Sequence, residues 1–130
     1  MPTFREAVEA HDLTDVEALL ADEVVFHSPV AYQPYIGKAI TAAILRAVVE
    51  VFEDFRYVRE LRDGVDHALL FEAKVDGLTI TGCDHLRYDD AGQIVDFMVM
   101  VRPLRAAEAL AARMAAQFEQ IKSRAAAAEQ

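Results

Sequence analysis

Hydrophobic residues near the N-terminus recur at helical spacing with one interruption. Between residues 3 and 21 the apolar side chains fall roughly three and four positions apart, and the repeat breaks over 11–14. Asp12 or Thr14 can cap a second helix, because a short polar side chain accepts hydrogen bonds from the free N–H groups of a first turn. The pattern therefore predicts two short helices.

The next segments have the patterns of a short strand, a loop and a long helix. Residues 24–27 are β-branched and aromatic, which favours a strand, and Pro29 ends it because proline cannot donate to a neighbouring strand. A loop is predicted over 30–37. Over 38–53 the spacing changes to three and four, which predicts a helix with one apolar face. That face carries Ile40, Ile44, Val48, Val51 and Phe52.

After residue 54 the hydrophobic pattern changes to period two, which is typical of strands. The alternating runs cover 55–59, 67–75, 78–88 and 94–101. Turn sequences containing Gly64, Gly77 and Gly92 separate them, and each glycine can take the positive φ that a tight turn requires. The pattern predicts an antiparallel meander of four strands.

The C-terminal segment is rich in alanine and follows Pro103, which ends the last strand. One long helix is predicted over 104–128, with an apolar face formed by Leu110, Met114, Phe118 and Ile121. No repeat or linker divides the sequence, so residues 1–130 are expected to form one α+β domain in which 104–128 is a helical extension. Helices packed against one face of a curved sheet are the simplest arrangement.

Asp84 is the main candidate for chemistry. Within 78–88 it shares one face of the predicted strand with Ile80, Gly82, Leu86 and Tyr88. A carboxyl group among apolar neighbours loses hydration, which raises its pKa and suits it to general acid/base catalysis near neutral pH. The alternative is that Asp84 accepts structural hydrogen bonds or lies at a rim, and the sequence leaves both open.

His27 is the second catalytic candidate, because it follows a buried-looking strand and can exchange a proton with Asp84 if both face the interior. The alternative is a core histidine bonded to backbone. Period two does not decide whether His27 or Phe26 faces inward. In the following loop, Tyr32 and Tyr35 are candidate hydroxyl donors at a pocket mouth.

Composition and charge exclude several function classes. With 13 Lys+Arg and 22 Asp+Glu the net charge is −9, which disfavours binding to nucleic acids and anionic membranes. Hydrophobic residues at 54% and charged residues at 27% argue against both disorder and a membrane span. The single cysteine, Cys83, precludes an internal disulfide and a cysteine zinc cluster, and the histidines lack metal-ligand spacing. We expect no metal or cofactor, and a cytoplasmic location.

The order of predicted elements resembles the nuclear transport factor 2-like superfamily, which includes ketosteroid isomerases and SnoaL-like polyketide cyclases. The resemblance covers about residues 3–103. It is carried by LLADEVVFHSP at 19–29, by Gly37-Lys38 and by GCDHLRYDDAGQI at 82–94. It implies a cone in which a bent sheet wraps around a long helix, with an apolar pocket at the open end.

The resemblance also implies where chemistry resides. Ketosteroid isomerases carry a proton-shuttling carboxylate before the proline of the first stretch, where this chain has Ser28. Their enolate-stabilising aspartate matches Asp84, and an ungapped alignment places Phe4 at the position of their partner tyrosine. Polyketide cyclases resemble the chain more closely, because their ring closure relies on an acidic residue from an equivalent late strand.

These observations predict a small-molecule pocket and a homodimer. The strand at 94–101 is apolar on both faces, so one face is expected to line the pocket and the other to contact a second copy. Whether Phe97 or Met98 faces inward stays open. The expected ligand-binding residues are Phe26, Ser28, Tyr32, Tyr35, Phe52, Phe55, Phe71, Leu86, Phe97 and Met98.

The function expected from the sequence is that of a cofactor-independent cyclase, isomerase or lyase. It would act on a small apolar carbonyl compound, with Asp84 as general acid/base and His27 assisting. Two alternatives stay open: a non-catalytic binder of a hydrophobic metabolite, and a dimeric interaction module whose pocket is filled by side chains.

Overall fold

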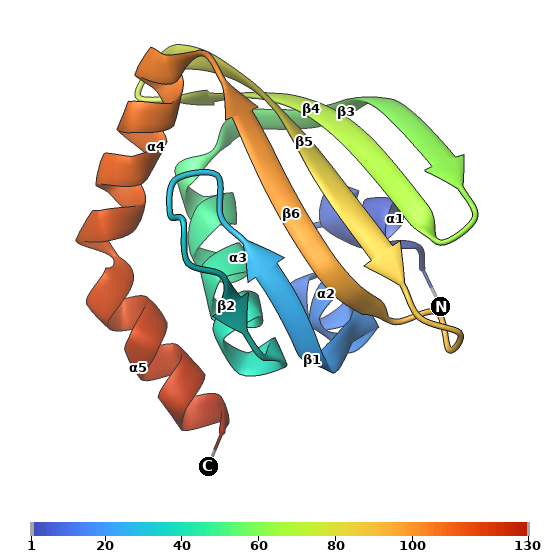
Figure 1. Cartoon of the computed structure of the whole chain (residues 1–130). Helices are drawn as coiled ribbons and strands as arrows, with labels where there is room; N and C mark the ends of the chain where they lie inside the picture. The colour runs from blue at the N-terminus through green and yellow to red at the C-terminus, as the bar shows by residue number, and fades with distance from the viewer. Residues whose placement is uncertain (1, 130) are drawn as a thin grey trace.

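The computed structural model describes residues 2–129 as helices packed on one face of a six-stranded sheet (Figure 1). The helices are α1 (Phe4–Glu9), α2 (Leu13–Leu19), α3 (Lys38–Val51), α4 (Leu104–Ala116) and α5 (Phe118–Ala128). The strands are β1 (Leu20–His27), β2 (Tyr35–Ile36), β3 (Glu53–Asp63), β4 (Asp66–Val75), β5 (Leu78–Tyr88) and β6 (Ile94–Arg102). The predicted α+β class is confirmed.

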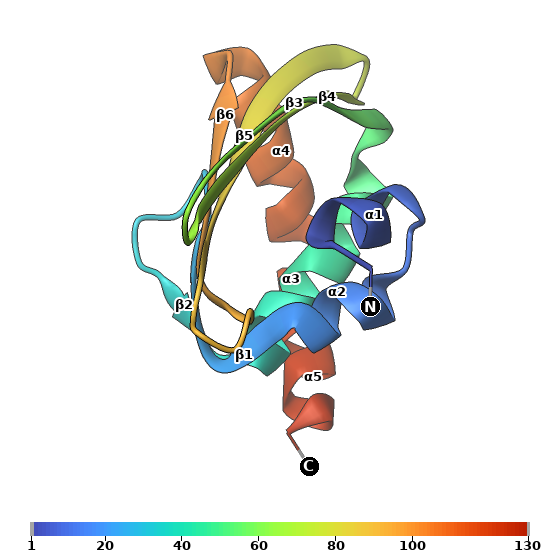
Figure 2. The ribbon, with the colours of Figure 1, turned by 90° about the vertical axis from the view of Figure 1, so that its right-hand side faces the viewer.

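The sheet is mixed, with strand order β2-β1-β6-β5-β4-β3. Strands β3 to β6 form the predicted antiparallel meander, whereas β1 runs parallel to β6. The turn glycines Gly64, Gly77 and Gly92 have φ values of 61°, 79° and 80°, as the turn sequences predict. Seen edge-on, the sheet curves around α1, α3 and α4 on its concave side (Figure 2).

Local hydrogen bonds explain the two short helices at the N-terminus. Thr3 and Glu6 form a reciprocal capping box at the start of α1. Of the two predicted caps for the second helix, Asp12 is the one used, because its side chain accepts a hydrogen bond of 3.0 Å from the Asp15 N–H. His11, with φ 56°, makes the turn between the helices.

Several predicted segments differ from those of the structure. The first strand begins at Leu20, because Leu20 already pairs with Ile94 of β6, before a register shift after which pairing resumes at Val25. The predicted loop contains the two-residue strand β2, which pairs with Val25 and Phe26. The C-terminal segment forms two helices separated at Gln117, where backbone with φ −103° and ψ 0° interrupts the helical hydrogen bonds.

The core lies between the concave face of the sheet and the helices. Phe71 and Phe97 are among its largest fully buried side chains. The Phe71 ring passes directly over Gly82 of the neighbouring strand. A Cβ atom at position 82 would collide with that ring and lie 2.9 Å from the Met100 carbonyl oxygen, so this close packing requires glycine.

Candidate functional site

A cavity of about 300 Å³ lies between the concave face of the sheet and the helices. This volume is at the lower end of the range of roughly 300–1,000 Å³ found for small-molecule sites. Its walls are mainly apolar. The lining residues are Phe4, Val8, His11, Leu13, Val16, Phe26, Ser28, Pro29, Val30, Ile44, Leu45, Val48, Val49, Phe52, Asp54, Phe55, Tyr57, Phe71, Asp84, Phe97, Val99, Leu110 and Met114.

Asp84 provides a buried carboxyl group in this cavity. It lies on the inward face of β5, between Leu69 of β4 and Val99 of β6, and is 7% exposed. Among residues 2–129 it is the only buried side chain with a carboxyl group. Loss of hydration on burial raises its pKa from the ordinary value of 3.8 to about 7. The alternation in the sequence predicts this inward orientation.

Tyr57 of β3 is the hydrogen-bond partner of Asp84. Its hydroxyl group donates a bond of 2.7 Å to Asp84 Oδ2, and both groups are buried. Burial and the neighbouring Asp84 charge raise the pKa of the phenol well above its ordinary value, so the phenol keeps its proton. The same hydrogen bond opposes the rise in the Asp84 pKa, because it favours the ionised carboxylate.

Tyr57 is not among the residues predicted from the sequence to carry chemistry. The available signal is its position two residues after Phe55, because period two places both side chains on the inward face of β3. Both line the cavity, and their rings meet edge-on with centroids 5.0 Å apart. The partnership with Asp84 has no sequence signal, because 27 positions and an intervening strand separate the two residues.

Polar groups from α1 and the β3–β4 hairpin lie behind Tyr57. The Arg5 guanidinium carbon is 6.0 Å from the centroid of the Tyr57 ring. Arg5 Nη1 donates a 3.0 Å hydrogen bond to Glu60, whose second carboxylate oxygen lies 2.7 Å from Nε2 of the buried His67. His67 Nδ1 is 2.7 Å from the Tyr88 hydroxyl oxygen. These contacts join α1, which carries part of the cavity wall, to β3 and β4.

His27 does not face Asp84, and the expectation that they share the interior is wrong. The inward residues of β1 are Val24 and Phe26, which are 0% and 3% exposed, so alternation places His27 on the opposite face. There its Nε2 atom lies 3.0 Å from Asp96 Oδ1.

Six of the predicted ligand-binding residues line the cavity: Phe26, Ser28, Phe52, Phe55, Phe71 and Phe97. Four do not. Tyr32 is 96% exposed, and the Tyr35 ring instead lies 6.4 Å from that of Phe118. Leu86 is fully buried in the core, and Met98 faces outward because its neighbour Phe97 faces inward.

Phe4 lies in the cavity wall, where its ring packs edge-on against Phe97 with centroids 5.5 Å apart. It has no hydroxyl group to donate to a ligand. Two polar residues without a predicted role, His11 and Asp54, also line the cavity, and both are exposed. Both have positive φ, at 56° for His11 in the turn before α2 and 53° for Asp54 at the start of β3.

Across 2–129, His, Cys, Asp and Glu side chains form no group of three or more that could hold a metal ion. The helices in this range are all too short or too polar to cross a bilayer.

A curved mixed sheet closed by helices around an apolar cavity is the architecture of the nuclear transport factor 2-like superfamily, and the chain has this cone fold. Within that class, the sequence pattern of the SnoaL-like domain matches residues 3–97, and the chain belongs to this family. Comparison with curated proteins gave no match.

Among the solved structures that match, two are similar over nine tenths or more of the chain. A steroid delta-isomerase from Pseudomonas aeruginosa is 39% identical, with a TM-score of 0.84 over 90% of this chain and 87% of the other. An uncharacterised protein with a cystatin-like fold from Silicibacter pomeroyi is 35% identical, with a TM-score of 0.83 over 93% and 90% of the two chains. A putative ketosteroid isomerase from Kribbella flavida, at 20% identity and a TM-score of 0.63 over 77% and 73%, shares the fold.

Proposed function

We propose that this protein binds a small, mainly apolar carbonyl compound in its cavity and catalyses proton transfer on it without a cofactor. The observation that carries the proposal is the buried Asp84 carboxyl group, with a pKa of about 7 and a hydrogen bond from Tyr57, in an otherwise apolar cavity. Similarity to a steroid delta-isomerase supports a reaction of this class.

The chemistry follows from the two protonation states of Asp84. Near pH 7 both are populated, since the pKa of the group is about 7. The ionised carboxylate accepts a proton from the carbon next to a carbonyl, and the resulting acid returns it to another carbon or oxygen. Isomerisation and aldol-type ring closure both begin with such a step. Tyr57 stays protonated and holds the carboxylate in place through its hydrogen bond.

Exchange of hydrogen for deuterium next to the carbonyl of 2-decalone, followed by NMR in D2O, tests this function without knowledge of the natural substrate. We expect the unmodified protein to accelerate exchange above the buffer rate and Asp84→Asn to lower the protein's contribution by about 10²–10⁴-fold. Asp63→Asn, at the exposed end of β3, is the matched control and should exchange at the unmodified rate. Equal rates for Asp84→Asn and the unmodified chain would refute the assignment.

Ser28 favours a second candidate function, which is non-catalytic binding of the same class of ligand. Ser28 lines the cavity where the family resemblance leads us to expect a proton-shuttling carboxylate, and a serine hydroxyl is a far weaker base. In that case Asp84 orients a ligand oxygen. Binding of 2-decalone with exchange at the buffer rate at every pH would support this candidate. A cavity of about 300 Å³ argues against an interaction module with a filled pocket.

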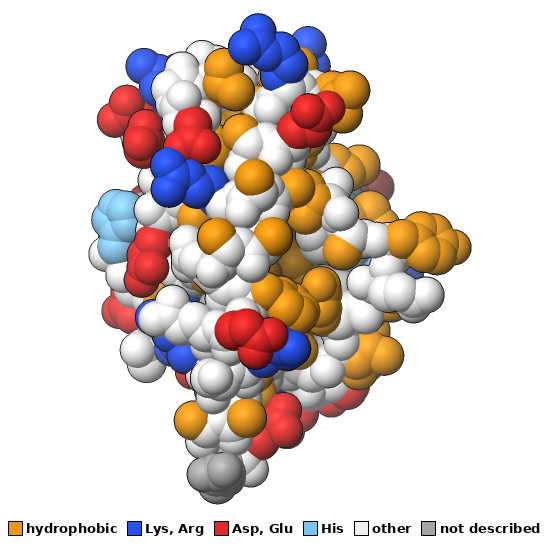
Figure 3. All heavy atoms as spheres, turned by 90° about the vertical axis from the view of Figure 1, so that its left-hand side faces the viewer, with side chains coloured by type: hydrophobic (Ala, Val, Ile, Leu, Met, Phe, Trp, Pro, Cys, Tyr) orange, Lys and Arg blue, Asp and Glu red, His pale blue; other side chains and the backbone are white. Residues whose placement is uncertain are grey.

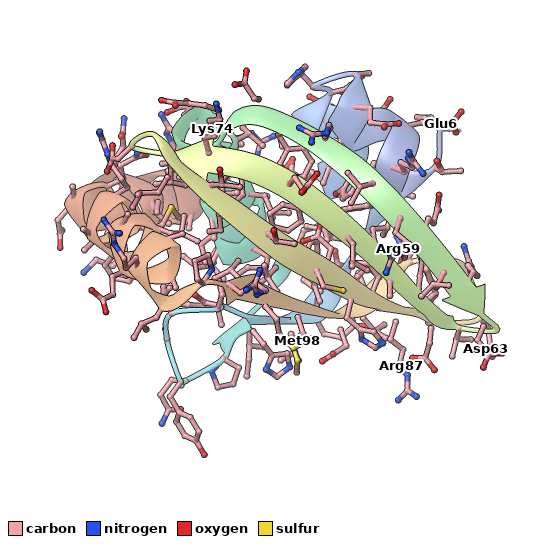
Figure 4. The ribbon with its side chains drawn as sticks, turned by 90° about the horizontal axis from the view of Figure 1, so that it is seen from above. Glu6, Arg59, Asp63, Lys74, Arg87 and Met98 are labelled. Carbon is pink, nitrogen blue, oxygen red and sulfur yellow. The ribbon has the colours of Figure 1, made fainter. Side chains whose placement is uncertain are left out.

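We also propose that the convex face of the sheet binds a second copy of the chain, so that the protein forms a homodimer. Met98 and Arg87 project from the convex side, away from the helices (Figure 4). On the same face Met100 is 52% exposed and pairs with Cys83 of β5. An apolar strip on a sheet face that also carries charges is typical of an interface with a polar rim.

A further inference from the structure

Helix α4 completes the cavity although it lies outside the part of the chain that defines the family. The SnoaL-like match ends at residue 97, within β6. Two side chains of α4, Leu110 and Met114, nevertheless line the cavity. Together with Ala106 they are spaced four apart, so they form one stripe on the side of α4 that faces the sheet and α3. Figure 2 shows α4 on the concave side of the sheet.

The contacts of α4 hold it in place against the sheet. Its first turns are anchored by Ala106, which is 0% exposed, and its last turn by Arg113, whose Nε atom donates a 2.9 Å hydrogen bond to Asp76 in the β4–β5 turn. Beyond the break, α5 packs on α3 through Ile121 and Ala125, which are 1% and 5% exposed. On the side of the molecule formed by these helices, hydrophobic side chains are visible among polar and charged ones (Figure 3).

The two cavity-lining side chains of α4 differ in how firmly they are held. Leu110 is 2% exposed, so its position is fixed by its neighbours. Met114 is half-buried, and an unbranched thioether adapts its shape to what it contacts. A change in the volume of Met114 is therefore accommodated in the cavity with the least disturbance of the core.

We propose that Leu110 and Met114 are specificity-determining residues that set the largest ligand the cavity admits. This proposal rests on the part of the proposed function that makes the cavity the ligand site. It does not depend on catalysis by Asp84. A filled apolar pocket discriminates between ligands that differ by one methylene group by about 10–200-fold. Added or removed volume at position 114 therefore changes the preference between a small and a larger ketone.

The test compares cyclohexanone with the two-ring 2-decalone, using dissociation constants from NMR titration of the full chain. We expect Met114→Ala to shift the ratio of the two constants toward 2-decalone by about tenfold and Met114→Phe to shift it toward cyclohexanone. Leu104→Ala is the control on the same helix, because Leu104 is 73% exposed and outside the cavity. It should keep the ratio of the unmodified chain.

A ratio that is the same in all four proteins would overturn the proposal, as would a shift in Leu104→Ala equal to that in Met114→Ala. Folding of each variant is checked by its melting temperature, and Leu110→Ala gives a second enlarged cavity with the same expected direction. Because the readout is binding, loss of the proposed catalytic function leaves this result unaffected. Failure of the unmodified chain to bind either ketone would overturn both this proposal and the role of the cavity as the ligand site.

Discussion

Tyr57 and Asp84 form a 2.7 Å hydrogen bond across the concave face of the sheet, although strand β4 lies between the strands that carry them. Asp84 pairs in register with Leu69 of β4, and Tyr57 pairs with Phe71 on the same strand. The tyrosine side chain therefore reaches diagonally over β4. Curvature shortens this path, since it brings side chains on the concave face closer together.

Asp84→Asn should change the pH dependence of stability. The pKa of Asp84 is about 7 in the folded protein and 3.8 ordinarily, so the folded state holds this proton more tightly. Binding of this proton contributes fully to the free energy of unfolding below about pH 4. The contribution, on the order of 4 kcal/mol, is lost as the pH rises to about 7. Asparagine does not titrate, so the stability of Asp84→Asn relative to the unmodified chain should rise across this window and level off above about pH 7.

Urea unfolding at pH 4.5, 6 and 7.5 measures this difference. Asp63→Asn, which replaces an exposed carboxyl group, serves as the control and should show no such trend. A difference between Asp84→Asn and the unmodified chain that is constant over the three pH values would contradict a raised Asp84 pKa.

Tyr57→Phe should raise the pKa of Asp84 above about 7. The phenol hydrogen bond stabilises the ionised carboxylate, and its removal leaves only the effect of burial. A carbon-13 NMR titration of the aspartate carboxyl groups reports the midpoint directly. A midpoint that is unchanged or lower would show that the hydrogen bond does not control this carboxyl group. The variant should also lose about 1–3 kcal/mol of unfolding free energy, because a buried acceptor loses its partner.

Gly82→Ala should destabilise the fold and distort the cavity floor. The new methyl group would collide with the Phe71 ring, and overpacking of this kind costs about 1–3 kcal/mol. Denaturant unfolding measures the loss. Gly82→Ala should cost less in a chain that already carries Phe71→Leu, because the ring is then absent, so an equal cost in the two backgrounds would exclude the ring as the cause.

Met100→Asp should convert a dimer to a monomer if the convex face is the subunit interface. Met100 is 52% exposed on that face, and a buried unpaired charge at an interface is strongly unfavourable. Size-exclusion chromatography with light scattering at micromolar concentration measures the mass. Val65→Asp, at the exposed β3–β4 turn, is the control and should keep the mass of the unmodified chain. A monomeric unmodified chain would refute the proposed interface.

The sequence alone determines the parts of this protein that depend on local pattern. Residues 78–88 alternate with period two, and Asp84 is the one acidic residue on the apolar face. The alternation therefore places Asp84 on that face without knowledge of the neighbouring strands. The turn glycines and the helix over Lys38–Val51 are predictable for the same reason, because φ preference and apolar spacing act within a few residues.

Tertiary structure decides the choices that local pattern leaves equal. Over 24–27 and 94–101 the sequence does not show which face is inward, so packing against the helices decides that Phe26 and Phe97 face inward and His27 outward. The Tyr57 hydroxyl likewise meets Asp84 across an intervening strand, and this contact depends on the arrangement of three strands, which has no signature in the sequence of either residue's own strand. The local sequence determines which way the side chains of a strand point when one of its faces is polar. When neither face is clearly polar, packing in the whole fold determines it.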